Sequence, residues 1–263
     1  MDWVELNGAG LRYDFRRGSG TPLLLIHEMG GTLESWDLVL PLLGEDRTIL
    51  RFDFRGAGQS TKIRGIGDID QMADDAAALL DHCGIAERVV VAGGAVGGAI
   101  AIHCAARHTR RVRGLVALGP ATGIPAERQQ QVLDHADNVE RNGMLFAADA
   151  ELPRSYPEVL RADRGRFERF RARWLANDPS SYAATYRMLA GYDLSDEVAG
   201  LAVPSLFLAG HHDPLRPPSM IEPLAATATG STFRAIESGH FMATQTPEII
   251  ADALARFTNA VSA

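Results

Sequence analysis

Residues 89–100 read Val89-Val90-Val91-Ala92-Gly93-Gly94-Ala95-Val96-Gly97-Gly98-Ala99-Ile100, and this stretch decides the fold. A run of β-branched apolar residues leads into four glycines, which flank two small or apolar residues. A helical pattern follows at once. The stretch therefore predicts a buried strand that turns sharply into a helix, at a point where the backbone needs the freedom of glycine.

Strands and helices alternate along most of the chain. We expect strands at 3–7, 11–15, 22–27, 48–54, 88–92, 112–118, 204–209 and 232–236, and helices at 32–43, 70–83, 96–107, 219–228 and 247–259. This order predicts an α/β fold with a mostly parallel, eight-stranded sheet and helices on both faces. Residues 123–196 are helical and Arg-rich, so we expect an inserted helical cap there. The core then comprises residues 1–122 and 197–263.

Composition and charge exclude several classes of protein. The 263 residues are 46% hydrophobic and 22% charged, with 26 Gly, 13 Pro and 2 Cys, which excludes disordered, collagen-like and disulfide-scaffold proteins. A net charge of −7 argues against a general nucleic-acid binder. Because no signal peptide or membrane-length apolar run is visible, we expect a cytoplasmic protein. Its expected partner is a small molecule, and its expected state is a monomer or homodimer.

Neither a metal ion nor a cofactor is expected. His211-His212-Asp213 is the densest group of potential ligands, but adjacent residues on a turn point apart and no HxxxH spacing accompanies them. Cys83 and Cys104 lie in expected helices without CxxC spacing, so we expect two reduced, buried thiols.

The glycine-rich turn can be compared with three motifs. A phosphate-binding loop needs a lysine that is missing here, and the dinucleotide-binding GxGxxG does not fit the spacing. The nucleophile elbow, GxSxG, fits residues 93–97 at every position except the nucleophile. Ala95 stands there, and a methyl group cannot attack a carbonyl carbon.

Together with four further motifs, this turn gives the whole chain a resemblance to the α/β-hydrolase superfamily. The other motifs are His27-Glu28-Met29-Gly30-Gly31, Asp53-Phe54-Arg55-Gly56-Ala57-Gly58-Gln59-Ser60, Gly210-His211-His212-Asp213-Pro214-Leu215-Arg216-Pro217-Pro218 and Ser238-Gly239-His240-Phe241-Met242. All five follow the superfamily's order. Among its branches, the chain looks most like 3-oxoadipate enol-lactonases and the carbon–carbon bond hydrolases of aromatic degradation.

The resemblance implies roles for individual residues. His240 would be the general base and later acid, and Asp213 would fix its tautomer. The backbone N–H groups of Met29 and Val96 would form the oxyanion hole. Ala95 occupies the position of the nucleophile.

The function implied is that of a serine hydrolase acting through an acyl-enzyme on a small carboxylic ester or lactone, including esters that bear a carboxylate. Since Asp213 and His240 are retained, Ala95 predicts an inactive Ser-to-Ala variant. A carbon–carbon bond or amide hydrolase would use the same triad. A native ligand-binding homologue without catalysis, and a cofactor-free oxygenase with His240 as its base, remain alternatives.

Four residues are candidates for substrate binding. Glu28 stands where the superfamily usually has Gly, and it fits a substrate contact, an auxiliary base or an ionic lock on its loop. Trp174, Phe146 and Arg169 come from the expected cap, where six arginines lie between 161 and 173. Most of these arginines fit a solvated helix face, while one or two could clamp a substrate carboxylate. For Asp53 and Arg55 we expect a structural role.

Overall fold

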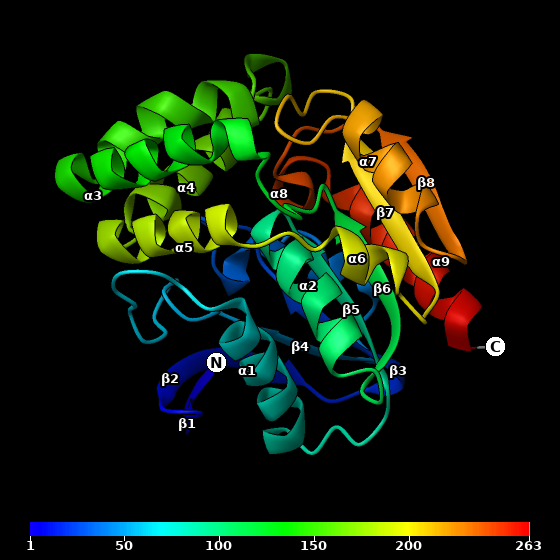
Figure 1. The fold of residues 1–263 in the computed structure, drawn as a ribbon. Coiled ribbons are helices and arrows are strands. Elements are labelled where there is room, and N and C mark those ends of the chain that lie inside the picture. Colours follow the sequence, from blue (N-terminus) through cyan, green and yellow to red (C-terminus); the bar gives the residue numbers. More distant parts are fainter. Residues whose placement is uncertain (263) are drawn as a thin grey trace.

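The computed structural model describes residues 1–262, and its centre is one eight-stranded sheet (Figure 1). The strands are β1 (Asp2–Leu6), β2 (Ala9–Arg16), β3 (Ser19–Ile26), β4 (Arg47–Phe52), β5 (Val89–Gly94), β6 (Val112–Leu118), β7 (Ser205–Gly210) and β8 (Ser231–Ile236). Their order across the sheet is β1-β2-β4-β3-β5-β6-β7-β8. The pairs β1–β2 and β2–β4 are antiparallel, and the remaining pairs are parallel. The predicted mostly parallel, eight-stranded sheet is confirmed.

Strand β3 shows how the sequence builds two cores around the sheet. Leu23 and Leu25 belong to one apolar cluster, and Leu24 and Ile26 belong to the other. Because successive side chains of a strand point to opposite faces, an uninterrupted apolar run needs cover on both sides.

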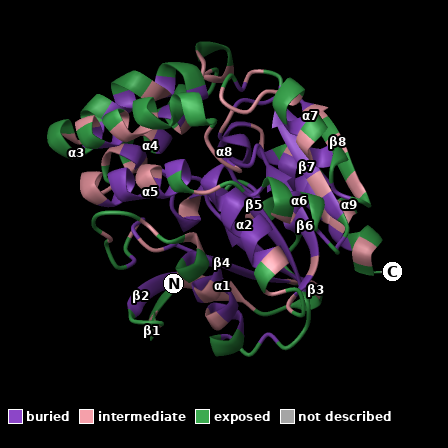
Figure 2. Cartoon of the chain, in the orientation of Figure 1, coloured by how far each residue is buried: buried purple, intermediate pink, exposed green. Residues whose placement is uncertain are grey.

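Helices provide that cover. Helices α1 (Ile69–His82), α2 (Val96–Arg107) and α7 (Pro218–Ala226) contribute to the cluster on one face. On the other face lie α9 (Pro247–Ser262) and the two short 3₁₀ helices η1 (Leu33–Trp36) and η2 (Leu40–Leu43). Figure 2 shows α2 as almost wholly buried, consistent with its central position over β5 and β6.

The helix predicted over 32–43 is wrong. The segment instead forms η1 and η2, with a break between them. Pro41 accounts for the break, because it has no N–H to donate to the carbonyl of Asp37, as a continuous helix would require, whereas proline is tolerated near the start of η2.

Between β6 and β7 the chain leaves the sheet and forms helices. These are α3 (Ala126–Ser155), η3 (Glu158–Leu160), α4 (Arg164–Leu175), α5 (Pro179–Gly191) and α6 (Ser195–Ala199). In Figure 1, α3, α4 and α5 lie together at one side of the molecule. Gly143, with φ 81°, folds α3 back on itself, and a β-bridge joins Gly123 to Asp193 near the two ends of the segment. Residues 123–196, the expected cap, contain α3 to α5 and the start of α6.

Within residues 1–262, none of the helices combines the length and apolar character needed to cross a membrane. Cys83 and Cys104 are both free and buried. Burial raises the pKa of the Cys83 thiol to about 11 and that of Cys104 to about 12. Both thiols therefore stay protonated and unreactive near neutral pH.

Candidate active site

The turn between β5 and α2 has the geometry of a nucleophile elbow. Ala95 adopts φ 49° and ψ −113°, a conformation that residues with a side chain rarely take. A Cβ atom on Gly93 would lie 2.1 Å from the carbonyl oxygen of Gly97, and one on Gly97 would lie 2.2 Å from that of His27. These glycines let the backbone close tightly around Ala95, so that its methyl group reaches the wall of a cavity.

His240 and Asp213 form a hydrogen-bonded pair at this cavity. His240 Nδ1 lies 2.8 Å from Asp213 Oδ2, and Asp213 is buried. Burial alone would raise the pKa of Asp213. The charge and hydrogen bond of His240, with the N–H groups of Leu215 and Arg216, outweigh burial and hold the pKa below its usual range. An ionised Asp213 keeps the Nδ1–H tautomer of His240, which leaves Nε2 as the base.

The predicted oxyanion-hole residues lie at the same cavity. Met29 and Val96 both line it. Among the residues that the structure describes, neither backbone N–H donates a hydrogen bond to another group. Val96 is also the first residue of α2, where the helix dipole favours negative charge. The arrangement can therefore hold an oxyanion beside Ala95.

The cavity measures about 960 Å³ and combines residues of the core and of the helical segment. Its lining includes Met29, Ala95, Val96, Arg128, His135, Glu151, Trp174, Tyr182, Tyr186, Tyr192, Arg216 and His240. A volume of this order is typical of small-molecule sites.

Of the four residues expected to contact substrate, Trp174 lines the cavity, whereas Glu28, Phe146 and Arg169 lie outside its lining. Glu28 is buried behind the loop, where its Oε1 accepts a hydrogen bond from the Ser35 hydroxyl at 2.7 Å. Phe146 is 37% exposed on α3 and packs against His135 from outside.

None of the six arginines at 161–173 lines the cavity. Helix α4 buries Phe167, Phe170 and Trp174, so Arg169 falls on the opposite, exposed side. The arginines at the cavity are Arg128, Arg154 and Arg216 instead. The sequence offered one signal for Arg216, its place in the motif that carries Asp213.

Arg216 is the arginine next to the His240–Asp213 pair. Its backbone N–H donates to Asp213 Oδ1 at 3.1 Å, and its guanidinium donates to the neighbouring carbonyl of Leu215. Within the described part of the chain, no carboxylate lies within 4.0 Å of this guanidinium. Burial lowers its pKa, opposed by the charge of Asp213. A half-buried cation without a carboxylate partner is suited to binding an anion.

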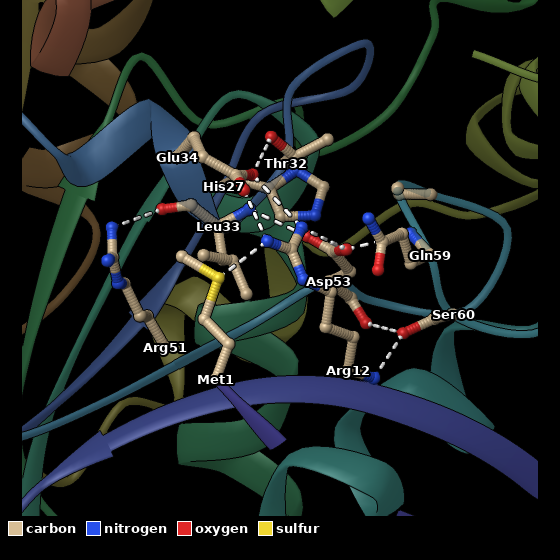
Figure 3. Close-up of polar contacts among 12 residues, drawn as sticks. Met1, Arg12, His27, Thr32, Leu33, Glu34, Arg51, Asp53, Gln59 and Ser60 are labelled. Atoms are coloured by element: carbon tan, nitrogen blue, oxygen red, sulfur yellow. Dashed lines mark hydrogen bonds and ion pairs between the residues drawn. The ribbon is translucent and has the colours of Figure 1, made fainter. Parts of the chain in front are cut away.

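Asp53 lies at the centre of a polar network with Arg12, Leu33 and Gln59 (Figure 3). This carboxylate is fully buried; it accepts hydrogen bonds from the backbone of Leu33 at 2.7 Å and of Gln59 at 2.8 Å. It also pairs with Arg12 at 3.3 Å, and Arg12 in turn pairs with Glu34. Leu33 begins η1 directly after the oxyanion loop, so these contacts hold the loop in place.

His27 supports the same loop from inside. Its ring stacks on Phe54 with the centroids 4.2 Å apart, and the Phe54 N–H donates to its Nε2. Nδ1 therefore carries the proton and donates to the Glu28 carbonyl at 2.7 Å. Arg55 pairs with Asp75 at 2.7 Å, away from the cavity lining. Over residues 1–262, no three His, Cys, Asp or Glu side chains form a group that could hold a metal ion.

Known proteins share this architecture. Residues 23–239 match the family described as serine aminopeptidase, S33. The acetyltransferase component of an acetoin-cleaving system from Pseudomonas putida is 36% identical over 61% of this chain, but the match spans only 42% of that protein. A malate-bound esterase from Thermogutta terrifontis superimposes with a TM-score of 0.92 at 27% identity, covering all of both chains.

An enol-lactonase from Burkholderia xenovorans superimposes with a TM-score of 0.90 at 25% identity, over 98% of this chain and all of the other. The similarity to α/β-hydrolases and enol-lactonases expected from the motifs is confirmed. The chain belongs to the serine aminopeptidase S33 family of α/β-hydrolases.

Proposed function

We propose that this protein binds a small carboxylic ester or lactone in a site of the hydrolase type. Ala95 prevents formation of the acyl-enzyme because it has no nucleophile. The observation that carries the proposal is the convergence at one cavity of Ala95, the His240–Asp213 pair and the backbone N–H groups of Met29 and Val96, which have no acceptor within residues 1–262. With serine at position 95, the same groups would complete a catalytic triad and oxyanion hole.

The reaction with serine follows from the position of each group. His240 Nε2 would take the hydroxyl proton as the serine oxygen attacks the carbonyl carbon, while Met29 and Val96 bind the oxyanion. His240 would then protonate the leaving alcohol and activate water to release the acid. A methyl group at position 95 removes the first bond-forming step and leaves binding intact.

The cation near the site favours a substrate that carries a carboxylate. Arg216 lines the cavity without a carboxylate partner among the described residues, and Arg128 lies on the same lining. The T. terrifontis esterase, which covers the whole chain, was solved with malate, a dicarboxylate. We assign Arg216 to the carboxylate of the substrate.

The test is the Ala95→Ser variant, assayed with p-nitrophenyl esters and a panel of lactones. Replacing a serine nucleophile costs about 10⁶-fold in kcat in a well-studied hydrolase, so we expect a gain of at least about 10³-fold. The control is the double variant Ala95→Ser/His240→Ala, which retains the new hydroxyl but loses its base. A folded Ala95→Ser protein without any gain would overturn the proposal.

Catalysis by His240 alone is a second candidate, because the chain keeps a base and an oxyanion hole without a nucleophile. These groups can take a proton from a carbon next to a carbonyl and hold the resulting enolate, which molecular oxygen could then attack. Oxygen uptake by the unaltered protein with a ketone substrate, lost in His240→Ala, would support this candidate. No uptake with either protein excludes it for the substrates tested.

A further inference from the structure

A second histidine–carboxylate pair lies at the same cavity, away from the catalytic residues. His135 Nε2 is 2.8 Å from Glu151 Oε1, and the Tyr182 hydroxyl donates to Glu151 Oε2 at 2.7 Å. His135 and Glu151 lie on the two halves of α3, on either side of the turn at Gly143. His135, Glu151, Tyr182 and Tyr186 all belong to the cavity lining.

This group is connected to His240 through the C-terminal end of α3. The backbone N–H of His240 lies 3.3 Å from the carbonyl oxygen of Ser155, and Ser155 follows Glu151 by one helical turn. The His135–Glu151 pair and His240 therefore belong to one continuous wall of the cavity. A group bound at His135 would be part of the same ligand whose carbonyl lies at Ala95.

The polarity of the second pair follows from its hydrogen bonds. A carboxylate accepts only, so Nε2 of His135 is the donor in its hydrogen bond with the Glu151 carboxylate, and in the singly protonated ring the lone pair is at Nδ1. Within residues 1–262, Nδ1 has no hydrogen-bond partner. Burial, followed by the charge of Glu151, raises the pKa of Tyr182 and Tyr186 well above the usual value, so both hydroxyls keep their protons. The open position of the group is an acceptor, His135 Nδ1.

Charges of both signs line this cavity, Glu151 on one hand and Arg128, Arg154 and Arg216 on the other. Glu151 repels a carboxylate, while Arg216 attracts one, and Tyr186 stands close enough for both charges to act on it. A ligand that fits this lining carries a carboxylate at one end and a hydrogen-bond donor at the other.

We propose that His135, oriented by Glu151, is a specificity site for a hydroxyl or N–H group at the far end of a small carboxylate-bearing substrate. The inference rests on the proposed function in using the same cavity and the same carboxylate site at Arg216. It adds a class of substrate, the hydroxylated or N–H-bearing carboxylate. A pair that only joined the halves of α3 would not discriminate between ligands.

The test measures binding to the unaltered protein by calorimetry. The probes are ω-hydroxy carboxylates of four to eight carbons, each compared with the unbranched carboxylate in which a methyl group replaces the hydroxyl, such as 6-hydroxyhexanoate and heptanoate. We expect the hydroxylated ligand to bind about tenfold more tightly at the best length, the effect of one well-placed hydrogen bond. Equal affinities at every length would overturn the proposal.

Two variants locate the effect. His135→Leu removes the acceptor and should reduce the hydroxyl-to-methyl affinity ratio to about one. The matched control is His103→Leu, because His103 also pairs with carboxylates, Glu197 at 2.9 Å and Asp70 at 2.7 Å, but is not part of the cavity lining. The ratio should be unchanged in the control.

Glu151→Gln tests the orientation without removing a side chain. The glutamine amide can accept from Tyr182 through its oxygen and donate to His135 Nε2, which moves the His135 proton to Nδ1. We expect 6-oxoheptanoate, an acceptor only, to gain affinity relative to heptanoate in this variant. An unchanged preference in folded Glu151→Gln would contradict the assigned tautomer and overturn the proposal.

The outcome is separable from that of the proposed function. These measurements use the chain with Ala95 and need no turnover, whereas the proposed function is tested by hydrolysis in Ala95→Ser. Hydrolysis without hydroxyl selectivity would overturn only the specificity site. Selectivity for the hydroxylated ligand, without hydrolysis by Ala95→Ser, would overturn only the proposed hydrolase function.

Discussion

His240 Nδ1 lies 2.8 Å from Asp213 Oδ2, yet the elbow beside this pair presents the methyl group of Ala95. The chain thus keeps an oriented histidine, an ionised carboxylate beside it and backbone N–H groups suited to an oxyanion, around a side chain that cannot act as a nucleophile. The backbone at this position also keeps its strained conformation, with φ 49° and ψ −113°.

That strain predicts a gain in stability for Ala95→Gly. A non-glycine residue in such a conformation costs about 1–3 kcal/mol, and glycine loses about 0.5–1 kcal/mol through its greater freedom in the unfolded chain. The net expectation is an increase of about 1 kcal/mol in the free energy of unfolding, measured by urea denaturation. Gly143→Ala is the opposite control, since Gly143 also has a positive φ (81°), and it should lower stability. A destabilised Ala95→Gly would mean that the elbow is not strained.

Arg216→Met should weaken the binding of small dicarboxylates such as malate. Loss of a charge-assisted hydrogen bond costs about 1.5–3 kcal/mol, which corresponds to roughly 10- to 100-fold in Kd. Calorimetry on the unaltered protein and the variant gives this ratio directly. Arg169→Met is the matched control, because Arg169 is exposed on α4. This variant should bind malate as tightly as the unaltered protein does. Equal losses in the two variants would point to a general charge effect in place of a site.

Glu34 should contribute to stability in a defined pH range. Burial would raise its pKa, but the hydrogen bonds from Arg12 and Thr32 outweigh burial and lower the pKa to about 2. A lowered pKa in the folded state stabilises the protein above the unfolded value, near 4.5, and this contribution is lost as the pH falls toward 2.

Glu34→Gln therefore should lower the free energy of unfolding by about 2 kcal/mol at pH 6, and the difference should shrink as the pH falls from 4.5 to 2. Urea denaturation at each pH measures it. Asp37→Asn serves as a control on the same loop, because Asp37 is more exposed and pairs with Arg51. A difference that stays constant with pH would show that Glu34 acts through packing alone.

Most of the fold could be predicted from the sequence because residues close together in the chain specify each strand, helix and turn. The apolar run 22–27 and the glycines around Ala95 each specify a conformation within a few residues, and the structure has a strand and an elbow there. The segment 32–43 shows the limit of periodicity, since Leu33, Trp36 and Leu40 fit one helix, but Pro41 cannot supply the N–H that a continuous helix needs.

The far half of the cavity could not be predicted in the same way. His135 and Glu151 are 16 positions apart and meet only because α3 reverses at Gly143. The arginines near 161–173 resembled a carboxylate clamp, but the direction of each depends on which face of α4 packs inward. Phe170 and Trp174 decide that face, and no local pattern reveals what they pack against.

The bridge between Gly123 and Asp193 makes the entry and exit of the helical excursion neighbours in space. The chain thereby leaves and rejoins the core at one place, so the residues between can be exchanged without altering the spacing of β6 and β7. The helical segment would then determine which substrate binds, and the turns at the ends of the strands would determine which bond is cleaved. A chimaera that takes residues 124–192 from the T. terrifontis esterase should fold and acquire that protein's ligand preference, while Ala95 still determines whether the bound ligand is cleaved.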